Sequence, residues 1–215
     1  MRILFNIIII IYCLSLSSSL HAIEAGLLIP IGSGSANGVH LANEDDSVKR
    51  DFDADIDLNG LGFFVDLKNK SQPFFIRSSI NYEKCSYRYQ NSFSHDFKRL
   101  SLDSTVCFNV LSRDIYSFWA GPQIRLALMH AKDENRYIES ELFAFGIGLA
   151  PSFGLNIKIS DSYSMGIQTG YRFNYYYGHI DESGYYGFYE EDGEFHNSEN
   201  ELFYIFLFTY NFNQY

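Results

Sequence analysis

The segment from residue 201 to residue 212 carries a large aliphatic or aromatic side chain at every second position. These residues are Leu202, Tyr204, Phe206, Phe208, Tyr210 and Phe212. Successive side chains of a β-strand point to opposite faces, so the six large groups share one face of a predicted strand. A strand with such a face is typical of a barrel wall that contacts lipid.

The first 22 residues have the pattern of a secretion signal. Met1 and Arg2 precede a mainly apolar run that ends at Leu16 and is followed by three serines and Ala22. This run is too short to cross a bilayer, which takes about 18 residues or more. We therefore predict a signal peptide over residues 1–22 and a single barrel domain over residues 23–215. A retained membrane helix is the alternative.

Composition and charge restrict the remaining classes of protein. The chain has 16 Lys and Arg against 26 Asp and Glu, a formal charge of −10, and 18% of its residues are aromatic. An acidic chain is a poor nucleic-acid binder, because phosphate neutralisation needs a basic surface. After the signal, no apolar stretch approaches the length of a spanning helix. If the mature chain enters a membrane, it has to do so as a closed barrel.

Eight segments alternate in residue type with a period of two. We predict strands at 23–31, 54–66, 73–89, 97–111, 115–130, 139–159, 163–177 and 201–212. Long connections are predicted at 32–53, 90–96, 131–138 and 178–200, and short ones at 67–72, 112–114 and 160–162. Short turns opposite long loops are typical of outer-membrane barrels. The predicted fold is therefore all-β, an eight-stranded antiparallel up-and-down transmembrane β-barrel.

The sixth predicted strand shows two distinct faces. The large residues of one face are Phe143, Phe145, Ile147, Leu149, Phe153, Leu155, Ile157 and Ile159. The residues between them are mostly Gly, Ala, Ser and Asn. In an eight-stranded barrel the large face would meet lipid and the small face would line a narrow lumen. A soluble β-sandwich is the alternative, but its outer face would carry many more charges.

The mature chain resembles the small eight-stranded outer-membrane barrels of the OmpA/OmpX type and the opacity-like surface antigens. The resemblance rests on the signal peptide, the rhythm of strands and loops, the stretch from Gly146 to Phe173, and the last strand. It implies secretion to the periplasm and insertion into the bacterial outer membrane by the assembly machinery. It also implies that the last strand carries the assembly signal, formed by Tyr204, Phe206, Phe208, Tyr210 and Phe212.

Charged residues of both signs fall on the predicted lumen face. They are Arg77, Glu83, Arg99, Asp103, Arg125, Lys158 and Arg172. The interior of an eight-stranded barrel is just wide enough for its side chains, and an unpaired buried charge costs several kcal/mol. We therefore predict an ion-pair network that plugs the lumen. A narrow or gated pore for ions or small solutes is the alternative.

Two cysteines, Cys85 and Cys107, fall on the inward phase of the third and fourth predicted strands. Aligning these strands at their periplasmic ends places Cys107 opposite Arg77, whereas a disulfide needs Cα atoms within about 7 Å. We predict two separate thiols, with a disulfide as the alternative because the compartment permits one. The spacing matches no zinc site, and we predict neither a metal nor a cofactor.

The last predicted loop, 178–200, is rich in Asp and Glu and contains no Lys or Arg. Its composition predicts a solvated surface, with a calcium site or a site for a basic partner as the alternatives. His196 and Ser198, with Glu199 or Glu201, contain the residue types of a nucleophilic hydrolase and weakly resemble those of lipid A deacylases. Three common polar residues also match such a set by chance.

The sequence thus predicts a surface protein of the bacterial outer membrane with a structural or adhesin-like role and no enzymatic activity. The expected partners are outer-membrane lipid and lipopolysaccharide, the assembly machinery, and a host or surface ligand at the loops. We expect a monomer that binds no nucleic acid. The pore is the first alternative, and a lipid A deacylase-like hydrolase is the second.

Overall fold

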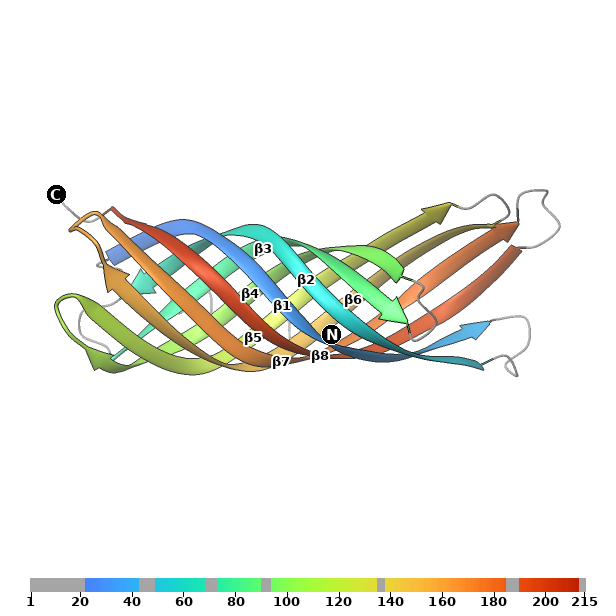
Figure 1. Cartoon of the computed structure of the whole chain (residues 1–215), viewed down its shortest axis with the longest axis horizontal. Helices are drawn as coiled ribbons and strands as arrows, with labels where there is room; N and C mark the ends of the chain where they lie inside the picture. The colour runs from blue at the N-terminus through green and yellow to red at the C-terminus, as the bar shows by residue number, and fades with distance from the viewer. Residues whose placement is uncertain are drawn as a thin grey trace, which may run out of the picture.

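The computed structural model describes residues 22–42, 49–68, 73–89, 94–134, 138–184 and 190–212. They form one closed ring in which each strand pairs antiparallel with the next and β8 pairs with β1 (Figure 1). The predicted all-β fold with eight antiparallel strands is confirmed. The strands are β1 (Ala22–Ala42), β2 (Lys49–Lys68), β3 (Phe74–Tyr89), β4 (Ser94–Ser112), β5 (Tyr116–Glu134), β6 (Ile138–Lys158), β7 (Tyr163–Gly184) and β8 (Glu190–Asn211).

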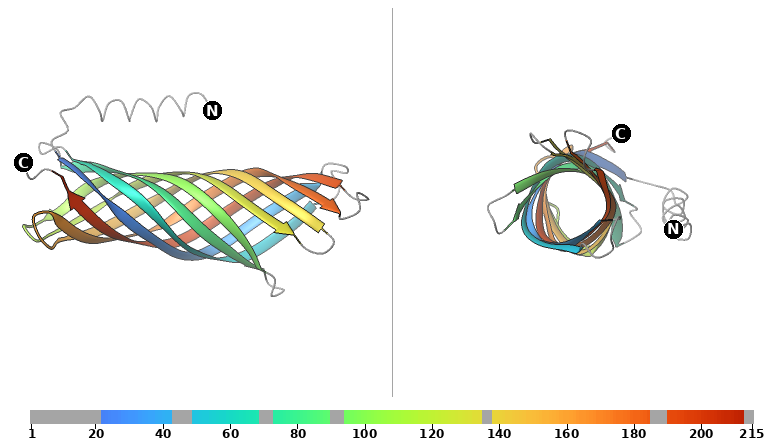
Figure 2. Two further views of the ribbon diagram at one scale, coloured as in Figure 1. Left: turned by 90° about the horizontal axis from the view of Figure 1, so that it is seen from above. Right: turned by 90° about the vertical axis from the view of Figure 1, so that its right-hand side faces the viewer.

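The barrel is long and narrow, with a nearly circular cross-section (Figure 2). The β4–β5 and β6–β7 connections lie at the end that also holds the start of β1, the end of β2, the start of β3 and the end of β8, and we call this the turn end. The last residues of β1, β3, β5 and β7 and the first residues of β2, β4, β6 and β8 lie at the opposite end, which we call the loop end. Among the described residues, no helix is long and apolar enough to cross a membrane.

The strands run much further toward the loop end than the sequence predicted. The predicted connections at 32–53 and 178–200 are mostly strand, and those at 90–96 and 131–138 are shortened as well, so these predictions were wrong. The segments are rich in Gly, Ser, Asn and acidic residues, which disfavour strands locally. The extended parts of β1, β7 and β8 are nevertheless paired on both sides in the closed ring. The first residues of β2 and β4 and the last residues of β5 are paired on one side. Ladder pairing therefore overrides the weak local propensity.

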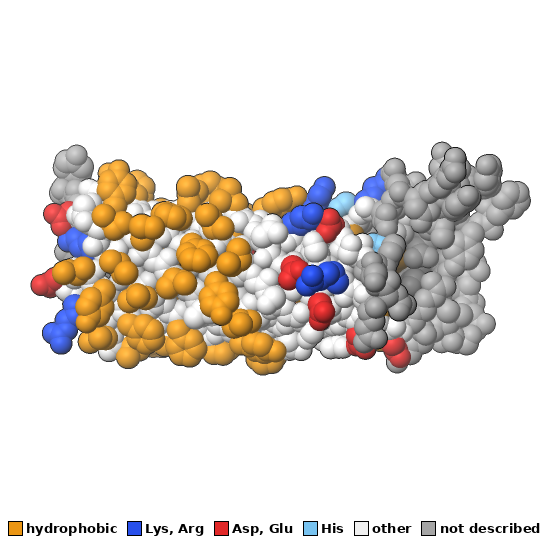
Figure 3. Space-filling view, in the orientation of Figure 1, with side chains coloured by type: hydrophobic (Ala, Val, Ile, Leu, Met, Phe, Trp, Pro, Cys, Tyr) orange, Lys and Arg blue, Asp and Glu red, His pale blue; other side chains and the backbone are white. Residues whose placement is uncertain are grey.

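The outward side chains change character along the strands. Toward the turn end they are large and apolar, and Phe63, Ile147 and Phe206 are each more than a third exposed. Beyond them toward the loop end the outward positions are polar, as at Asp55 and Asp57 on β2. Figure 3 shows both zones on one face of the molecule. We call the first zone the apolar belt, and it comprises the outward residues of 27–31, 61–65, 76–82, 100–110, 116–128, 143–157, 163–177 and 202–212.

The β3–β4 register keeps the two cysteines apart. Cys85 pairs with Phe97, and Cys107 pairs with Phe75. The predicted pairing of Cys107 with Arg77 was wrong by two residues. The reason is that β4 continues to Ser112 at the turn end, past the first residue of β3. Both cysteines are buried and free, so the prediction of two separate thiols is confirmed.

Both thiols are expected to resist alkylation in the folded barrel. Cys107 lies level with Phe75, which is ten residues from Cys85 along β3, or roughly 33 Å. Maleimide treatment of the mature chain, followed by mass measurement, should give no adduct in the native state and an adduct at both cysteines after unfolding. Omitting the reducing agent should change neither result. An adduct in the native state would contradict this arrangement. So would an unfolded chain that reacts with maleimide only after a reducing agent is added, because that would indicate a disulfide.

Candidate functional site: the barrel interior

A group of charged side chains crosses the interior at mid-length, and we call it the charge cluster. None of its members is more than 3% exposed. The register explains why they meet, because direct cross-strand partners carry opposite charge: Glu83 with Arg99, Asp103 with Arg125, and Arg172 with Glu201. The cluster consists of Glu83, Arg99, Asp103, Arg125, Arg172, Glu199 and Glu201.

Arg125 is held by two carboxylates. Its Nε and Nη2 donate to the two oxygens of Asp103 at 2.7 and 2.8 Å. Its Nη1 and Nη2 donate to the two oxygens of Glu83, both at 2.8 Å. Such fork-shaped pairing is the strongest form of protein ion pair. Arg125 therefore joins β3, β4 and β5 across the interior.

Arg99 contacts three carboxylates. Its nitrogens lie 2.7 Å from Glu83, 2.8 Å from Glu199 and 2.7 Å from Glu201. Arg172 completes the cluster by donating to Glu201 at 3.1 Å and to the amide oxygen of Gln123 at 2.9 Å. Three guanidinium groups thus face four carboxylates.

Glu199 differs from the other carboxylates, because most of its partners are neutral. Tyr87 donates its hydroxyl to Oε1. The amide nitrogen of Asn197 lies 3.2 Å from Oε1, and that of Asn174 lies 3.2 Å from Oε2. Arg99 supplies its one cationic contact. Glu199 is therefore the acid that depends least on ion pairing.

A second buried ion pair lies nearer the turn end. Arg77 donates from Nε and Nη2 to the two oxygens of Asp66, both at 2.7 Å. Its guanidinium carbon lies 4.7 Å from the ring centre of Phe64 and 5.3 Å from that of Trp119. Gly154 leaves room for the indole, because a Cβ there would overlap it. Aromatic stacking and pairing together hold this cation.

The interior of the loop-end half is apolar. Ile56, Met129 and Tyr176 are buried there to 1% exposure or less. The surrounding core consists of Ala36, Ala54, Leu58, Cys85, Tyr87, Phe97, Ala127, Leu142, Ala144 and Phe195. This half therefore has a polar outside and an apolar inside, as a soluble barrel does. The belt region has an apolar outside, and it encloses buried charges together with two smaller apolar clusters. These clusters consist of Leu28, Phe64, Ala150, Phe203, Ile205 and Leu207, and of Phe75, Cys107 and Trp119.

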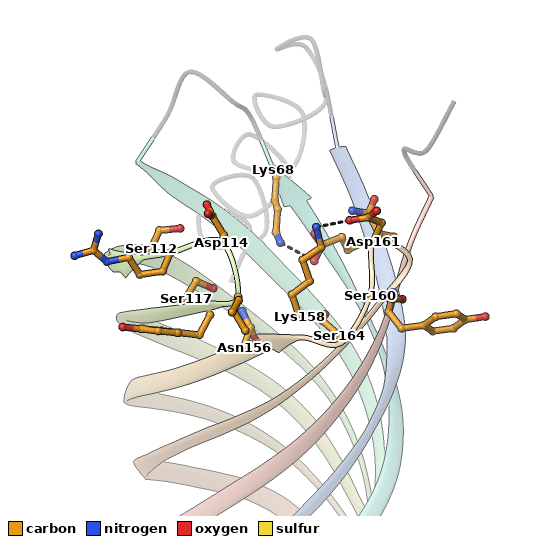
Figure 4. A pocket seen from close by; sticks show the side chains of 15 residues that line it. Lys68, Ser112, Asp114, Ser117, Asn156, Lys158, Ser160, Asp161 and Ser164 are labelled. Carbon is orange, nitrogen blue, oxygen red and sulfur yellow. Dashed lines mark hydrogen bonds and ion pairs between the residues drawn. The ribbon is translucent and has the colours of Figure 1, made fainter.

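Six of the seven residues predicted for the lumen point inward and are buried; they are Arg77, Glu83, Arg99, Asp103, Arg125 and Arg172. Lys158 lines the open mouth at the turn end and is not part of the buried network, so its prediction as a member of that network was wrong. It is the last residue of β6; its side chain is half exposed, and its Nζ lies 2.5 Å from Asp161 in the following turn (Figure 4). That hydrogen bond lowers the pKa of Asp161.

Sequence reasoning missed Asp66, Glu199 and Glu201 as interior residues. Asp66 has the inward phase of β2, and Glu201 lies two residues from the inward Phe203, so both positions could have been found from alternation. The two glutamates were instead assigned to an acidic loop and its edge. They belong to β8, which begins at Glu190, eleven residues before the start of the predicted strand.

The turn-end mouth is an open polar cavity of about 230 Å³ (Figure 4). Lys68 pairs there with Glu24 at 2.6 Å. The charged groups at the mouth are therefore largely paired with one another. In the part of the chain that the structure describes, no group of three or more His, Cys, Asp or Glu side chains could hold a metal ion.

The residues of the hydrolase alternative are divided between two faces. Glu199 and Glu201 are buried inside, whereas Ser198 is exposed on the outer face of β8. The ring of His196 lies 2.9 Å from the hydroxyl of Tyr175 and 3.3 Å from Glu194. The structure therefore does not bring the proposed acid together with the proposed nucleophile.

Comparison with known proteins gives likeness in structure only. No family model and no curated protein matches the chain. The outer membrane protein OprG from Pseudomonas aeruginosa aligns over 88% of this chain and 97% of its own, with a TM-score of 0.60 and 12% identity. Neisserial surface protein A aligns over 85% of this chain and 97% of its own, with a TM-score of 0.36 and 12% identity. The outer membrane protease OmpT from Escherichia coli aligns over 90% of this chain and 98% of its own, with a TM-score of 0.41 and 9% identity. The likeness to OprG shows that the fold is one adopted by outer-membrane barrels.

Proposed function

We propose that this protein spans the outer membrane of a bacterium through its apolar belt, keeps its lumen closed to solutes, and has a structural or adhesin-like role at the cell surface. The observation that carries the proposal is the change along the barrel: the belt has an apolar outer surface over buried charges, whereas the loop-end half has a polar outer surface over an apolar core. The fold shared with OprG supports the same placement. The turn end would face the periplasm and the loop end the exterior.

The height of the belt fits a bilayer. On β8 the large outward residues run from Leu202 to Phe212, which is ten residues or roughly 33 Å of strand. At a tilt of about 40° this corresponds to about 25 Å along the barrel axis, the usual height of the apolar band in such barrels. Contiguous apolar surface on this scale is rare on soluble monomers.

The interior supports a closed lumen. The ion-paired charge cluster fills the middle of the barrel, and the apolar core lies beyond it toward the loop end. Moving either group would break buried ion pairs or expose apolar side chains. We therefore favour a surface role over the pore. Planar bilayers containing the refolded protein should show no discrete conductance, and regular unitary steps would favour the pore instead.

A lysine in the apolar belt tests the membrane placement. Ile147→Lys is expected to lower the free energy of unfolding in lipid vesicles by about 2–4 kcal/mol, because it puts a charge near the bilayer midplane. Asn37→Lys is the matched control on an exposed outward position beyond the belt, and should cost less than about 1 kcal/mol. Urea titration of vesicle-inserted protein measures both. Equal effects, or a wild-type chain that stays soluble without detergent, would contradict the placement.

A further inference from the structure

Three basic side chains lie in one row across the outer surface of β3, β4 and β5. Lys84 is the direct cross-strand partner of Lys98, and Lys98 is the partner of His130. All three have the outward phase of their strands. Like charges directly opposite each other destabilise a sheet. The arrangement therefore favours an anion from outside the row.

The acids of this chain neutralise the row only in part. Lys84 lies 2.7 Å from Asp96, and His130 lies 2.9 Å from Glu141. Lys98 lies between them and forms no ion pair with an acid of the described ranges, because the nearby Asp96 and Glu141 pair with Lys84 and His130. A cationic group therefore remains available at the centre of the row.

The row stands at the loop-end edge of the apolar belt. The next outward positions toward the turn end are Tyr82, Leu100 and Leu128, which are 55%, 44% and 41% exposed. In the proposed membrane placement the row would lie at the level of the lipid headgroups of the outer leaflet. Basic side chains at this level attract anionic lipids by about 1 kcal/mol each.

A groove lies lower on the same strands. Ser78 and Ser104 are direct cross-strand partners with outward phase, and their small side chains leave a hollow among larger neighbours. The cavity measures about 520 Å³. The hydroxyl of Ser78 is buried there without a hydrogen-bond partner. The groove is lined by the outward side chains of Phe63, Val65, Ile80, Leu102, Ile124 and Leu126.

The spacing of the row and the groove suits a lipid. Six residues separate Lys84 from Ser78, which is roughly 20 Å of strand. With the usual tilt, this is about 15 Å of depth, or half the thickness of the hydrocarbon core. An acyl chain that starts at the headgroup level would therefore end in the groove.

We propose that the outer surface of β3 and β4 binds an anionic lipid, with the headgroup phosphate on Lys84 and Lys98 and an acyl chain in the Ser78–Ser104 groove. The proposal rests on the membrane placement proposed above. Charge complementarity selects an anionic headgroup over a zwitterionic one, and the groove selects a membrane lipid over free phosphate.

The test uses the mature protein in bilayers of dimyristoyl phosphatidylcholine with a minor share of dimyristoyl phosphatidylglycerol. Native mass spectrometry of the released protein should find phosphatidylglycerol retained in preference. Removing both charges, K84Q with K98Q, should weaken this preference about 25-fold, or about fivefold for each lysine. The control K68Q with K158Q removes two lysines at the turn end and should leave the preference unchanged. Equal retention in both double variants would overturn the proposal.

The groove is tested separately by filling it. Ser104→Leu should reduce retention of phosphatidylglycerol, whereas Ala120→Leu, an outward belt position beyond the groove lining, should not. Inorganic phosphate should fail to displace the lipid. Displacement by phosphate, or unchanged retention in Ser104→Leu, would overturn the assignment of the acyl chain. A wild-type dimer that Ser104→Leu makes monomeric would also overturn it, because the groove would then be an interface between two copies.

The two proposals fail in different ways. A protein that does not insert into bilayers of phosphatidylcholine alone contradicts the membrane placement. A protein that inserts but shows no preference for phosphatidylglycerol contradicts the lipid site and leaves the placement intact.

Discussion

Arg125→Ala is expected to lower the free energy of unfolding by about 3–5 kcal/mol, because it leaves Glu83 and Asp103 buried with fewer cationic partners. The expected loss arises from the stranded carboxylates rather than from the removed side chain. Trp119, the one tryptophan of the sequence, is fully buried beside the interior cation Arg77 and reports unfolding by fluorescence. Urea titration of the barrel in vesicles measures the change.

The matched control for this variant is Arg88→Ala. Arg88 pairs with Asp57 at 2.9 Å, but both side chains are more than half exposed. A solvated pair of this kind contributes at most about 1 kcal/mol. If both alanine variants lost the same stability, the buried cluster would not hold the barrel together.

Glu83→Gln and Glu199→Gln are expected to differ, although each removes one negative charge from the same cluster. Glu83→Gln should lower the free energy of unfolding by about 3 kcal/mol. Both carboxylate oxygens of Glu83 accept hydrogen bonds from guanidinium N–H groups, so the amide nitrogen of glutamine would place a donor against these donors. Glu199→Gln should cost less than about 1 kcal/mol. Asn197 makes this possible, because its Oδ1 has no partner and can accept from the new amide after a flip.

Charge balance points the same way. Four carboxylates face three guanidinium groups, so the cluster has one acid more than its cations neutralise. Glu199 contacts a single arginine, whereas Glu83 and Glu201 each contact two. Parallel urea titrations of the two glutamine variants measure the difference. Equal losses, or a larger loss for Glu199→Gln, would show that the excess acid is elsewhere.

Alternation of residue type was sufficient to predict the eight strands and their ring. The large outward groups of β6 and β8 define the phase of those strands whatever their partners are, and one face follows from the other. The same phase predicted that Arg77, Glu83 and Arg172 point inward. It could not predict which of these charges pair, because that depends on the exact register of neighbouring strands, and the predicted β3–β4 register was wrong by two residues.

The ends of the strands were not predictable in this way. Between Asp51 and Asp57 every second residue of β2 is an aspartate, and the residues between them are Phe52, Ala54 and Ile56. Aspartate disfavours strands, so the first part of this segment was predicted to be a loop although its residues alternate. Glu199 was missed for the same reason. Its inward position depends on β8 being continuous from Glu190, which ladder pairing with β1 and β7 enforces.

In the proposed membrane placement, the continuation of the strands beyond the apolar belt sets the distance between the membrane and whatever the protein meets outside it. From Asn59 to Lys49, β2 covers ten residues, or about 25 Å of height at the usual tilt. The loop-end tips of the strands would thus lie well beyond the belt, on a stretch of barrel that has its own apolar core. A protease acting from outside should cut only at its rim, and the cut barrel should remain closed, because cross-strand hydrogen bonds hold every pair below the cut.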